Sequence, residues 1–344
     1  MPRILLLDRE EGAIVSILLA IPVGLIFCYL IGRFFQAFPG KDLPELLNVY
    51  IPKFITVLFL LIVGIVWFAA GLLSVITYSF FIKRFLSPNA SLIYIVSMIL
   101  LFIYYGALMK SKNVLYAIEM IFIFTVPLIV LILIKGFGND YFEWDFVKVA
   151  IMYIQHPPRY SAFCAAVFIF WGPANFIVFN RVMTKKQSMT WKSLLIIGLV
   201  GTGILSISFF VPIGMLGFES VGAVVNPGMT TADTLQFRHG IIERVLFVAL
   251  MLFLAVTFMS ILIHWHVAIE LLKNVIHFKK LKWKKHNLTP HLLLLVFWFT
   301  SVRVVTYLTE YQLVKYTSYF YNLFPFLLSI MLLILWSIKR RTQV

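Results

Sequence analysis

The sequence predicts an all-α protein, a polytopic bundle of transmembrane helices. Hydrophobic residues make up 62% of the 344 and charged residues only 12%, about half the charged fraction of an ordinary soluble domain. The apolar residues gather into nine stretches of roughly 20 residues, the length that a helix needs to cross the hydrocarbon core of a bilayer. The basic residues gather in the short connections between these stretches. Together these observations place the chain in a lipid bilayer.

Nine spans are predicted along the chain. The connections between them reach about 25 residues at most, so residues 1–344 are expected to form a single transmembrane domain with no inserted soluble domain. Both cysteines, Cys28 and Cys164, fall inside spans, which argues against a disulfide framework. The spans cover residues 12–31, 55–81, 92–109, 115–134, 162–183, 194–218, 245–272, 292–308 and 319–338.

The basic residues also predict the orientation of the bundle. The net charge is 29 − 14 = +15. Because most of the basic residues lie in short loops, the charge indicates the orientation of the protein in the membrane, and no nucleic-acid partner is expected. The loops 181–192 and 273–291 and the C-terminal tail are rich in lysine and arginine and share one side, which the positive-inside rule assigns to the cytoplasm. Lys83 and Arg84 are exceptions on the opposite side. With nine spans, a cytoplasmic C-terminus puts the N-terminus outside.

Two connections are predicted to carry short helices. After the first span, PGKDLPELLNVYIPK begins a helix at Asp42, with Glu45 three residues on as a capping box. The apolar residues on one face of this helix are Leu43, Leu46, Leu47 and Tyr50. It is therefore expected to lie as an amphipathic helix on the cytoplasmic membrane surface. On the outer side, YFEWDFVKVAIMYIQHPP predicts a second interfacial helix that stops before Pro157 and Pro158.

The fifth predicted span contains the sequence FWGPANFIVFN. Pro173 removes a helical hydrogen bond and frees a carbonyl group near Ile169, while Gly172 lets the chain leave helical geometry. In lipid such groups are tolerated only against other protein or facing a polar cavity. Many secondary transporters use broken helices at mid-depth to present bare carbonyls to a ligand. The pattern indicates either such a site or a simple proline kink, and Asn175 beyond the break favours the site.

Several short motifs occur along the chain in a specific order. They are FPGK after the first span, YAIEMIFIFTVPL with Glu119, the broken span FIFWGPANF, NPG from Asn226, and IERVLFVAL. In this order they resemble the spore-germination permease family, the B subunits of nutrient germinant receptors within the amino acid–polyamine–organocation superfamily. The resemblance covers essentially the whole chain.

The resemblance implies a LeuT-like arrangement of five plus five helices in inverted repeats, with the first and sixth helices broken around a central ligand. The opening LLDREEGAIVSILLA resembles the approach to the family's second helix. We therefore expect the sequence to lack the family's first helix, through a misassigned start codon or as a degenerate paralogue. That absence would account for the odd number of spans and for an N-terminus on the outer side.

The resemblance also makes the broken span one wall of a ligand site. Its candidate ligand-binding residues are Trp171, Gly172, Pro173, Ala174 and Asn175. Two other spans have suitable residues at similar depth. Phe68, Gly71 and Ser74 share a face of 55–81, and Thr257 and Ser260 share a face of 245–272. For both sets, close helix packing by small residues is the competing explanation.

Several ionisable side chains lie inside predicted spans. Glu119 and Arg303 differ in depth by roughly 10 Å at 1.5 Å per residue, so a direct ion pair is not expected. Because an ionised group in hydrocarbon is costly, each is predicted to have a structural or gating role. His264 and His266 are two residues apart and point to different helix faces, which is poor geometry for a metal. No metal site and no cofactor is predicted.

Three classes of function are compatible with a solute site in such a bundle. The resemblance implies a nutrient-sensing subunit of a germinant receptor, which binds an amino acid or similar solute and signals to A and C subunits. Its place would be the spore inner membrane or the cell membrane. An amino-acid permease with alternating access is the alternative. A membrane enzyme is not predicted, because the sequence contains no metal set, nucleophile–base pair or phosphate motif.

Overall fold

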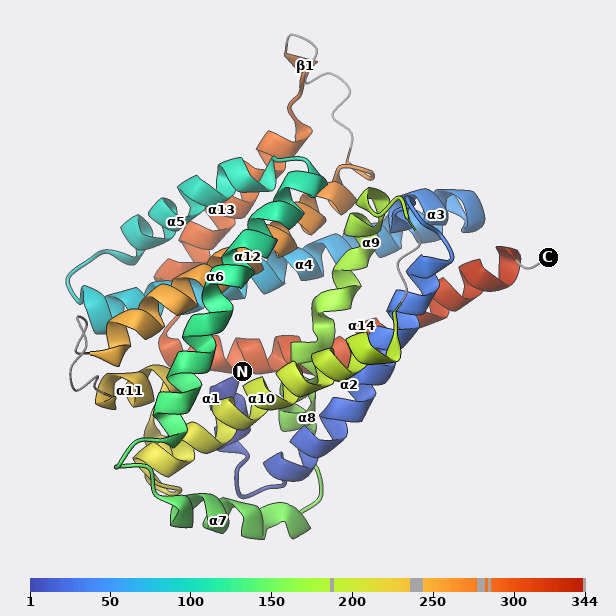
Figure 1. Ribbon diagram of the computed structural model, residues 1–344. Coiled ribbons are helices and arrows are strands. Elements are labelled where there is room, and N and C mark those ends of the chain that lie inside the picture. The colour runs from blue at the N-terminus through green and yellow to red at the C-terminus, as the bar shows by residue number, and fades with distance from the viewer. Residues whose placement is uncertain (186–188, 236–243, 277–281, 284–285, 343–344) are drawn as a thin grey trace.

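A computed structural model of the chain describes residues 1–185, 189–235, 244–276, 282–283 and 286–342 (Figure 1). These residues form a bundle of long apolar helices, which confirms the predicted all-α transmembrane class. Part of the basis for the predicted orientation lies outside the described residues, namely Lys186, Lys279, Lys280, Lys284 and Lys285.

The chain contains both long helices and short ones. The α-helices are α1 (Pro2–Leu7), α2 (Ala13–Gln36), α3 (Leu43–Tyr50), α4 (Lys53–Phe81), α5 (Leu92–Ala107), α6 (Ser111–Phe137), α7 (Trp144–Met152), α8 (Tyr160–Val167), α9 (Phe176–Phe179), α10 (Trp191–Leu216), α11 (Pro227–Thr234), α12 (Val245–Leu272), α13 (Thr289–Tyr307) and α14 (Glu310–Thr342). A π-helical turn, η1 (Ile82–Leu86), follows α4, and the 3₁₀ segments are η2 (Tyr153–Gln155), η3 (Phe168–Asn175), η4 (Asn180–Val182) and η5 (Ser220–Ala223). The strands β1 (Lys282–Trp283) and β2 (His286–Asn287) pair antiparallel. A helix forms at the second predicted connection: α7 is followed by η2, which ends before Pro157.

Each of the nine predicted spans corresponds to a helical segment. Among the described residues, eight of these segments are long and apolar enough to cross a bilayer. The ninth, α5, has 16 residues and falls just short of the roughly 17 that a span needs. The predicted span 245–272 matches α12 at both ends, whereas the last helix begins at Glu310 instead of at 319. The first turns of α14 carry the polar residues Gln312 and Lys315, so a prediction from hydropathy alone places the start of this helix too late.

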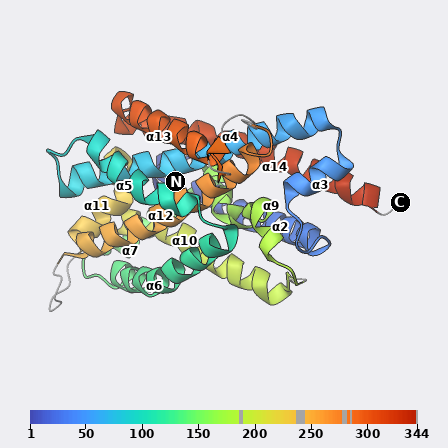
Figure 2. The same cartoon turned by 90° about the horizontal axis from the view of Figure 1, so that it is seen from above.

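Helices that lie far apart in the sequence pack against each other. α2 contacts α8 and η3, α4 contacts α12, and α5 contacts α13 (Figure 1, Figure 2). The pair α4 and α12 makes the most extensive of these contacts and lies in the middle of the bundle.

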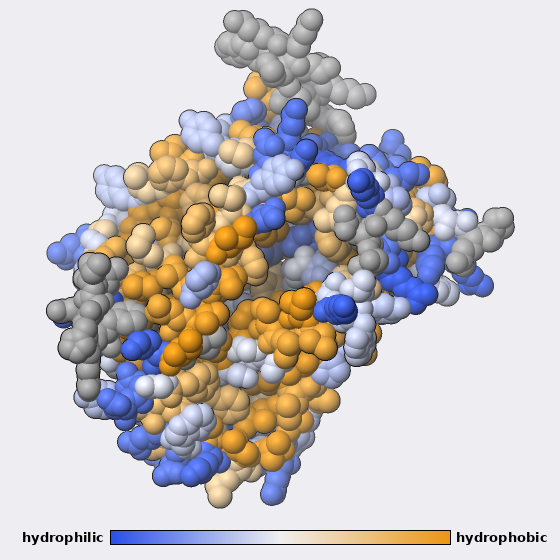
Figure 3. Space-filling view, in the orientation of Figure 1, coloured by the Kyte–Doolittle hydropathy of each residue, from blue (hydrophilic) through white to orange (hydrophobic). Residues whose placement is uncertain are grey.

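Apolar side chains cover much of the outside of the bundle. Figure 3 shows a broad apolar face with hydrophilic side chains toward its margins. Exposed large apolar residues include Ile26 of α2, Ile65 of α4, Phe102 of α5 and Phe124 of α6. Soluble monomers rarely expose so large an apolar surface, whereas the acyl chains of a bilayer would cover it.

The short helix α3 forms where the sequence predicts it but faces protein instead of lipid. Asp42 caps its first turn, and its Oδ1 atom accepts a hydrogen bond from the backbone N–H of Glu45 at 3.0 Å. Leu43, Leu46 and Leu47 are buried, because α3 packs against α4, α9 and α14. The apolar face that is predicted to lie in the membrane surface is therefore covered by protein. An apolar face of this kind suits a protein groove as well as a membrane interface, and the sequence does not distinguish the two.

The predicted break in the fifth span is a tighter helix instead of extended chain. α8 passes directly into η3, and η3 passes into α9 and η4. Gly172 and Pro173 both lie inside η3, and Gly172 does not have a positive φ. The expectation that the chain unwinds at Gly172 is therefore wrong. A 3₁₀ segment keeps the backbone hydrogen-bonded on both sides of the proline, as a lipid environment requires.

Pro173 leaves one carbonyl of η3 without its helical partner. In a 3₁₀ segment the N–H of residue 173 would pair with the carbonyl of Phe170, and proline has no N–H. The affected carbonyl is thus one residue beyond Ile169, where α-helical geometry predicts it. The Sγ atom of Cys28 on α2 donates a hydrogen bond to the Phe170 carbonyl at 3.2 Å, and Cys28 is fully buried. A thiol is a weak donor, yet here it satisfies a backbone acceptor in the interior of the bundle.

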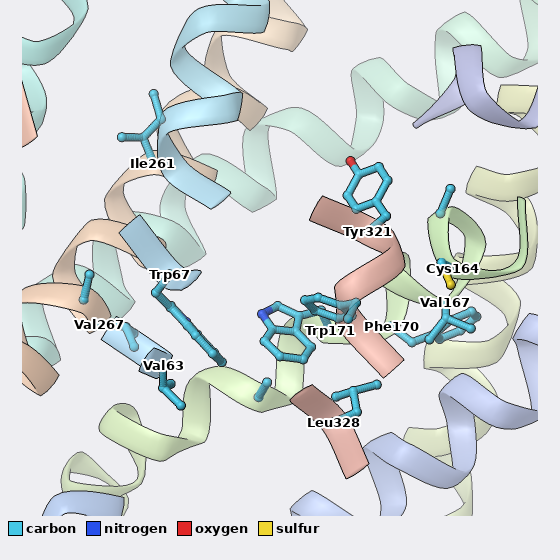
Figure 4. Close-up of a cluster of buried hydrophobic side chains, with 14 of the residues drawn as sticks. Val63, Trp67, Cys164, Val167, Phe170, Trp171, Ile261, Val267, Tyr321 and Leu328 are labelled. Carbon is cyan, nitrogen blue, oxygen red and sulfur yellow. The ribbon is translucent and has the colours of Figure 1, made fainter. Parts of the chain in front are cut away.

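Aromatic side chains fix η3 in the bundle (Figure 4). The ring of Phe170 lies between α2 and α10, where a Cβ atom on Gly24 or Gly201 would approach it to 2.3 or 2.5 Å. Any side chain at either glycine would therefore displace the ring. Trp171 packs toward α4, with its ring centroid 4.7 Å from that of Trp67. The segment is thus held on both sides by rings that fit between helices.

Cys28→Ala should destabilise the protein by about 1–3 kcal/mol, because it leaves the buried Phe170 carbonyl unsatisfied. Cys28→Ser keeps a donor and should cost less. In a Pro173→Ala background the new N–H can pair with the same carbonyl, so the Cys28→Ala penalty should shrink. Thermal unfolding of the wild type, the single variants and the double variant in detergent measures this cycle. Equal penalties in both backgrounds would show that the thiol only fills space.

Candidate functional site

A cavity of about 280 Å³ lies between α1, α4, α11, α12 and α14. Three of the predicted ligand-binding residues line it: Ser74 of α4, and Thr257 and Ser260 of α12. The hydroxyl oxygens of Ser74 and Ser260 are 2.9 Å apart and share a hydrogen bond between the two helices. Thr77 and Thr317 add further hydroxyl groups to the lining. The pairing of α4 with α12 therefore brings together residues that lie far apart in the sequence.

The remaining lining of the cavity is largely apolar. Phe168, the first residue of η3, lies against it, together with Phe320 and Tyr321 of α14. The ring centroids of Phe168 and Tyr321 are 4.7 Å apart. A small solute in the cavity would contact hydroxyl groups and aromatic rings, the combination that is usual in small-molecule sites. It would also contact the start of η3 directly.

Charged and amide groups bound the more exposed end of the cavity. Asn226 donates a hydrogen bond to Oε2 of Glu310 at 3.0 Å, and Arg84 forms an ion pair with the same oxygen at 2.9 Å. Arg84, an exception to the predicted charge pattern, therefore has a carboxylate partner. The guanidinium of Arg3 also lines the cavity and donates to the carbonyl of Gly222 at 2.6 Å. The NPG motif that begins at Asn226 thus forms part of the cavity wall.

Two other predicted residues of α4 have packing roles and do not line the cavity. A Cβ atom on Gly71 would lie 2.4 Å from the ring of Trp265, so glycine is required here for α4 and α12 to approach. The ring of Phe68 stacks on Phe297 with centroids 4.2 Å apart. Its backbone carbonyl accepts a hydrogen bond from Nε1 of Trp265 at 3.3 Å. Close packing of helices, the alternative to a ligand-binding role, therefore accounts for both Phe68 and Gly71.

The predicted residues of the broken span also lie outside this cavity. Trp171 and Ala174 are buried in the helix packing. Asn175 accepts a hydrogen bond from Nε1 of Trp67 at 2.8 Å and donates one to the carbonyl of Gly172 at 3.0 Å. Asn175 therefore ties η3 to α4. Gly172 is exposed, and a Cβ atom there would meet no atom within 4 Å.

Glu119 and Arg303 lie on the surface of the bundle. Glu119 is exposed on α6, and its carboxylate has no ion pair or hydrogen bond within the described part of the chain. Arg303 is exposed on α13, where it donates to the hydroxyl of Tyr307 at 3.1 Å and lies over that ring. The two do not pair with each other. A carboxylate inside the bundle is instead Glu270, which the sequence analysis did not single out.

Glu270 is the buried carboxylate of a partly buried group of charges at the far end of the broken span. Arg181, which follows α9 within η4, forms an ion pair with Glu270 of α12. It also approaches Asp42, with Nη1 3.6 Å from Oδ2. Lys273 forms a second ion pair with Glu270. Burial raises the pKa of the Asp42 carboxyl, and the positive charge of Arg181 opposes this increase.

Two further residues complete this group, and together we call the six the Arg181 cluster: Asp42, Ser111, Arg181, His266, Glu270 and Lys273. Arg181 donates a hydrogen bond to the hydroxyl of Ser111, whose oxygen lies 2.7 Å from Nε2 of His266. The other ring nitrogen of His266 lies 3.0 Å from the carbonyl of Ala107. The cluster therefore joins the ends of α5, α6, α12 and η4 to the start of α3.

Sequence reasoning missed the Arg181 cluster because its members come from separate segments and form no local motif. In the sequence, Arg181 is one of several loop cations and Glu270 lies near the end of an apolar span. The available signal was the carboxylate itself, since an ionised group within a span requires a partner.

His264 lies between the cavity and the cluster on α12. Its Nδ1 atom is 2.6 Å from the carbonyl of Ser260, and its Nε2 atom is buried without a hydrogen-bond partner among the described residues. No group of three or more His, Cys, Asp or Glu side chains in the described part of the chain is arranged to hold a metal.

Comparison with known proteins agrees with this architecture. A family model described as spore germination protein, the spore permease family, matches residues 2–306, so the match extends from α1 to the end of α13. No curated protein sequence matches the chain. The match covers most of the sequence, and the apolar helices make the protein a multi-pass membrane protein. The chain therefore belongs to the spore permease family of spore germination proteins, as its motifs predict.

Proposed function

We propose that this chain is the nutrient-sensing subunit of a spore germinant receptor, which binds an amino acid or similar small solute in the cavity beside Ser74, Thr257 and Ser260. The cavity itself carries the proposal. Its volume of about 280 Å³ lies just below the range of about 300–1,000 Å³ for sites that bind drug-sized ligands, which suits a solute as small as an amino acid. Its lining combines hydroxyl groups with aromatic rings. Membership of a germination family connects such a site with the response to nutrient.

The polar groups around the cavity suit a solute that carries both charges. The hydroxyl of Thr257 can donate a hydrogen bond to a carboxylate. The hydroxyls of Ser74 and Ser260 would do so in exchange for the bonds that they make with the carbonyl of Ala70 and with each other. Glu310 at the more exposed end can accept hydrogen bonds from an ammonium group. The aromatic wall at Phe168 would then contact the apolar part of the solute.

The segment from η3 to η4 offers a route from the solute to the Arg181 cluster. Phe168 at its start contacts the cavity, and Arg181 lies at its end. Between them, the ring of Trp171 and the hydrogen bonds of Asn175 hold the segment to α4. A solute that displaces Phe168 would therefore move a segment whose far end is held by ion pairs. Rearrangement of these pairs is the proposed signal.

We place the Arg181 cluster and the C-terminus on the cytoplasmic side, as the basic loops favour. The expected partners are the A and C subunits of the receptor, in the spore inner membrane.

A secondary permease is the second candidate, since a cavity near one side and a closed ion-pair cluster near the other also suit alternating access. Concentrative uptake of labelled amino acids by proteoliposomes would favour the permease, whereas nutrient-triggered germination without uptake would favour the sensor.

Removing hydroxyl groups from the cavity should weaken the response to nutrient. Thr257→Val and Ser260→Ala each remove one donor, and each should raise the amino-acid concentration for half-maximal germination by roughly twofold to tenfold, the equivalent of about 0.5–1.5 kcal/mol. Thr202→Val on α10 removes a hydroxyl outside the cavity and is the matched control. Germination is compared in strains with equal protein levels. Normal responses from both cavity variants would exclude this cavity as the nutrient site.

Glu270→Gln should lower the nutrient threshold and permit some germination without nutrient. It removes the charge that the partly buried Arg181 and Lys273 share. Because Glu270 itself is buried, the closed arrangement loses stability. Lys148→Gln breaks an exposed ion pair with Asp145 and should change nothing, because exposed pairs contribute little. An unchanged or raised threshold for Glu270→Gln at equal protein level would contradict the proposed closing role.

A further inference from the structure

A groove of about 510 Å³ lies between α2 and α14, apart from the cavity and the Arg181 cluster. Its lining is mainly aliphatic and aromatic and includes Leu30, Phe34, Leu332 and Trp336. Leu30 and Trp336 are exposed on the outside of the bundle. Both helices end at the same side of the molecule (Figure 1). The groove therefore opens where bilayer lipid would surround the protein.

The length of the groove matches one leaflet of a bilayer. Its residues on α14 run from Ser329 to Lys339, which at 1.5 Å per residue corresponds to about 15 Å. This is half of the roughly 30 Å hydrocarbon core. An acyl chain that enters beside Lys339 could therefore lie along the groove for the depth of its own leaflet.

Two cations stand at one end of the groove. Arg33 lies in the last turn of α2 and Lys339 in the last turn of α14. Within the described residues, neither side chain forms an ion pair with a carboxylate. The guanidinium of Arg33 donates to the hydroxyl of Tyr29 at 2.6 Å, and Arg340 lies 5.4 Å from the ring centre of Trp336. The end of the groove thus carries positive charge without a protein counter-charge.

We propose that this groove binds an anionic phospholipid, with its phosphate between Arg33 and Lys339 and one acyl chain along Leu30 and Leu332. A guanidinium group matches a phosphate with paired donors. Trp336 lies near the cations, as tryptophan does at membrane interfaces. A neutral phospholipid would fill the same apolar groove but leave both cations without a net counter-charge. The bound lipid would brace α2, the helix that supplies Cys28 to η3.

Native mass spectrometry of the purified protein with added phosphatidylglycerol, or phosphatidylcholine with the same acyl chains, tests this site. Each nearby cation strengthens binding to an anionic lipid by roughly fivefold. The double variant Arg33→Gln, Lys339→Gln should therefore bind phosphatidylglycerol roughly 25-fold more weakly and bind phosphatidylcholine as the wild type does. Lys112→Gln removes a cation that lies over Tyr116 on α6, and it should leave both affinities unchanged.

Thermal unfolding provides a second readout, because Arg33 and Lys339 also lie where cations complement a helix dipole. Phosphatidylglycerol should raise the melting temperature of the wild type more than phosphatidylcholine does, and the double variant should lose this difference. Equal binding of both lipids by the wild type would overturn the proposal. So would unchanged phosphatidylglycerol binding by the double variant, whatever its stability without lipid.

Discussion

The backbone of η3 must satisfy its hydrogen bonds where no water is available, and this constraint shapes the centre of the protein. Pro173 has no N–H to donate to the carbonyl of Phe170, and the thiol of Cys28 donates a hydrogen bond to this carbonyl instead. That contact requires α2 to lie close along η3. Gly24 and Gly201 permit this approach because they leave room for the Phe170 ring. Both the backbone carbonyl and the ring of Phe170 therefore hold η3 against its neighbours, the carbonyl through Cys28 of α2 and the ring between α2 and α10.

A segment that is fixed at its centre can couple events at its two ends. Phe168 at one end contacts the cavity, and Arg181 at the other end forms an ion pair with Glu270. The same two regions are joined by α12, which carries Ser260 beside the cavity and Glu270 in the cluster. Packed interiors pass on small displacements instead of absorbing them. The proposed sensor therefore needs no large hinge between solute and signal.

The sequence predicts this fold well because each span is recognised from the average of some 20 residues. It also predicts Ser74, Thr257 and Ser260, since hydroxyl groups at helical spacing share a face. It does not predict that Gly71 meets Trp265, because the partner of a packing residue lies on another helix. The Arg181 cluster is harder still, since its six residues come from four segments that must pack together before the cluster forms. Helical spacing describes one helix, whereas these contacts require the order in which helices pack.

Hydrogen–deuterium exchange of the protein in lipid nanodiscs, with and without a mixture of L-amino acids, tests the coupling most directly. If solute binding moves η3 and loosens the Arg181 cluster, the amides of α9, η4 and α3 should exchange faster when amino acids are present. The amides around Ser74 and Thr257 should exchange more slowly in the same sample. Protection around the cavity with no change in α9, η4 and α3 would contradict the account, because the solute would then bind without reaching the ion pairs.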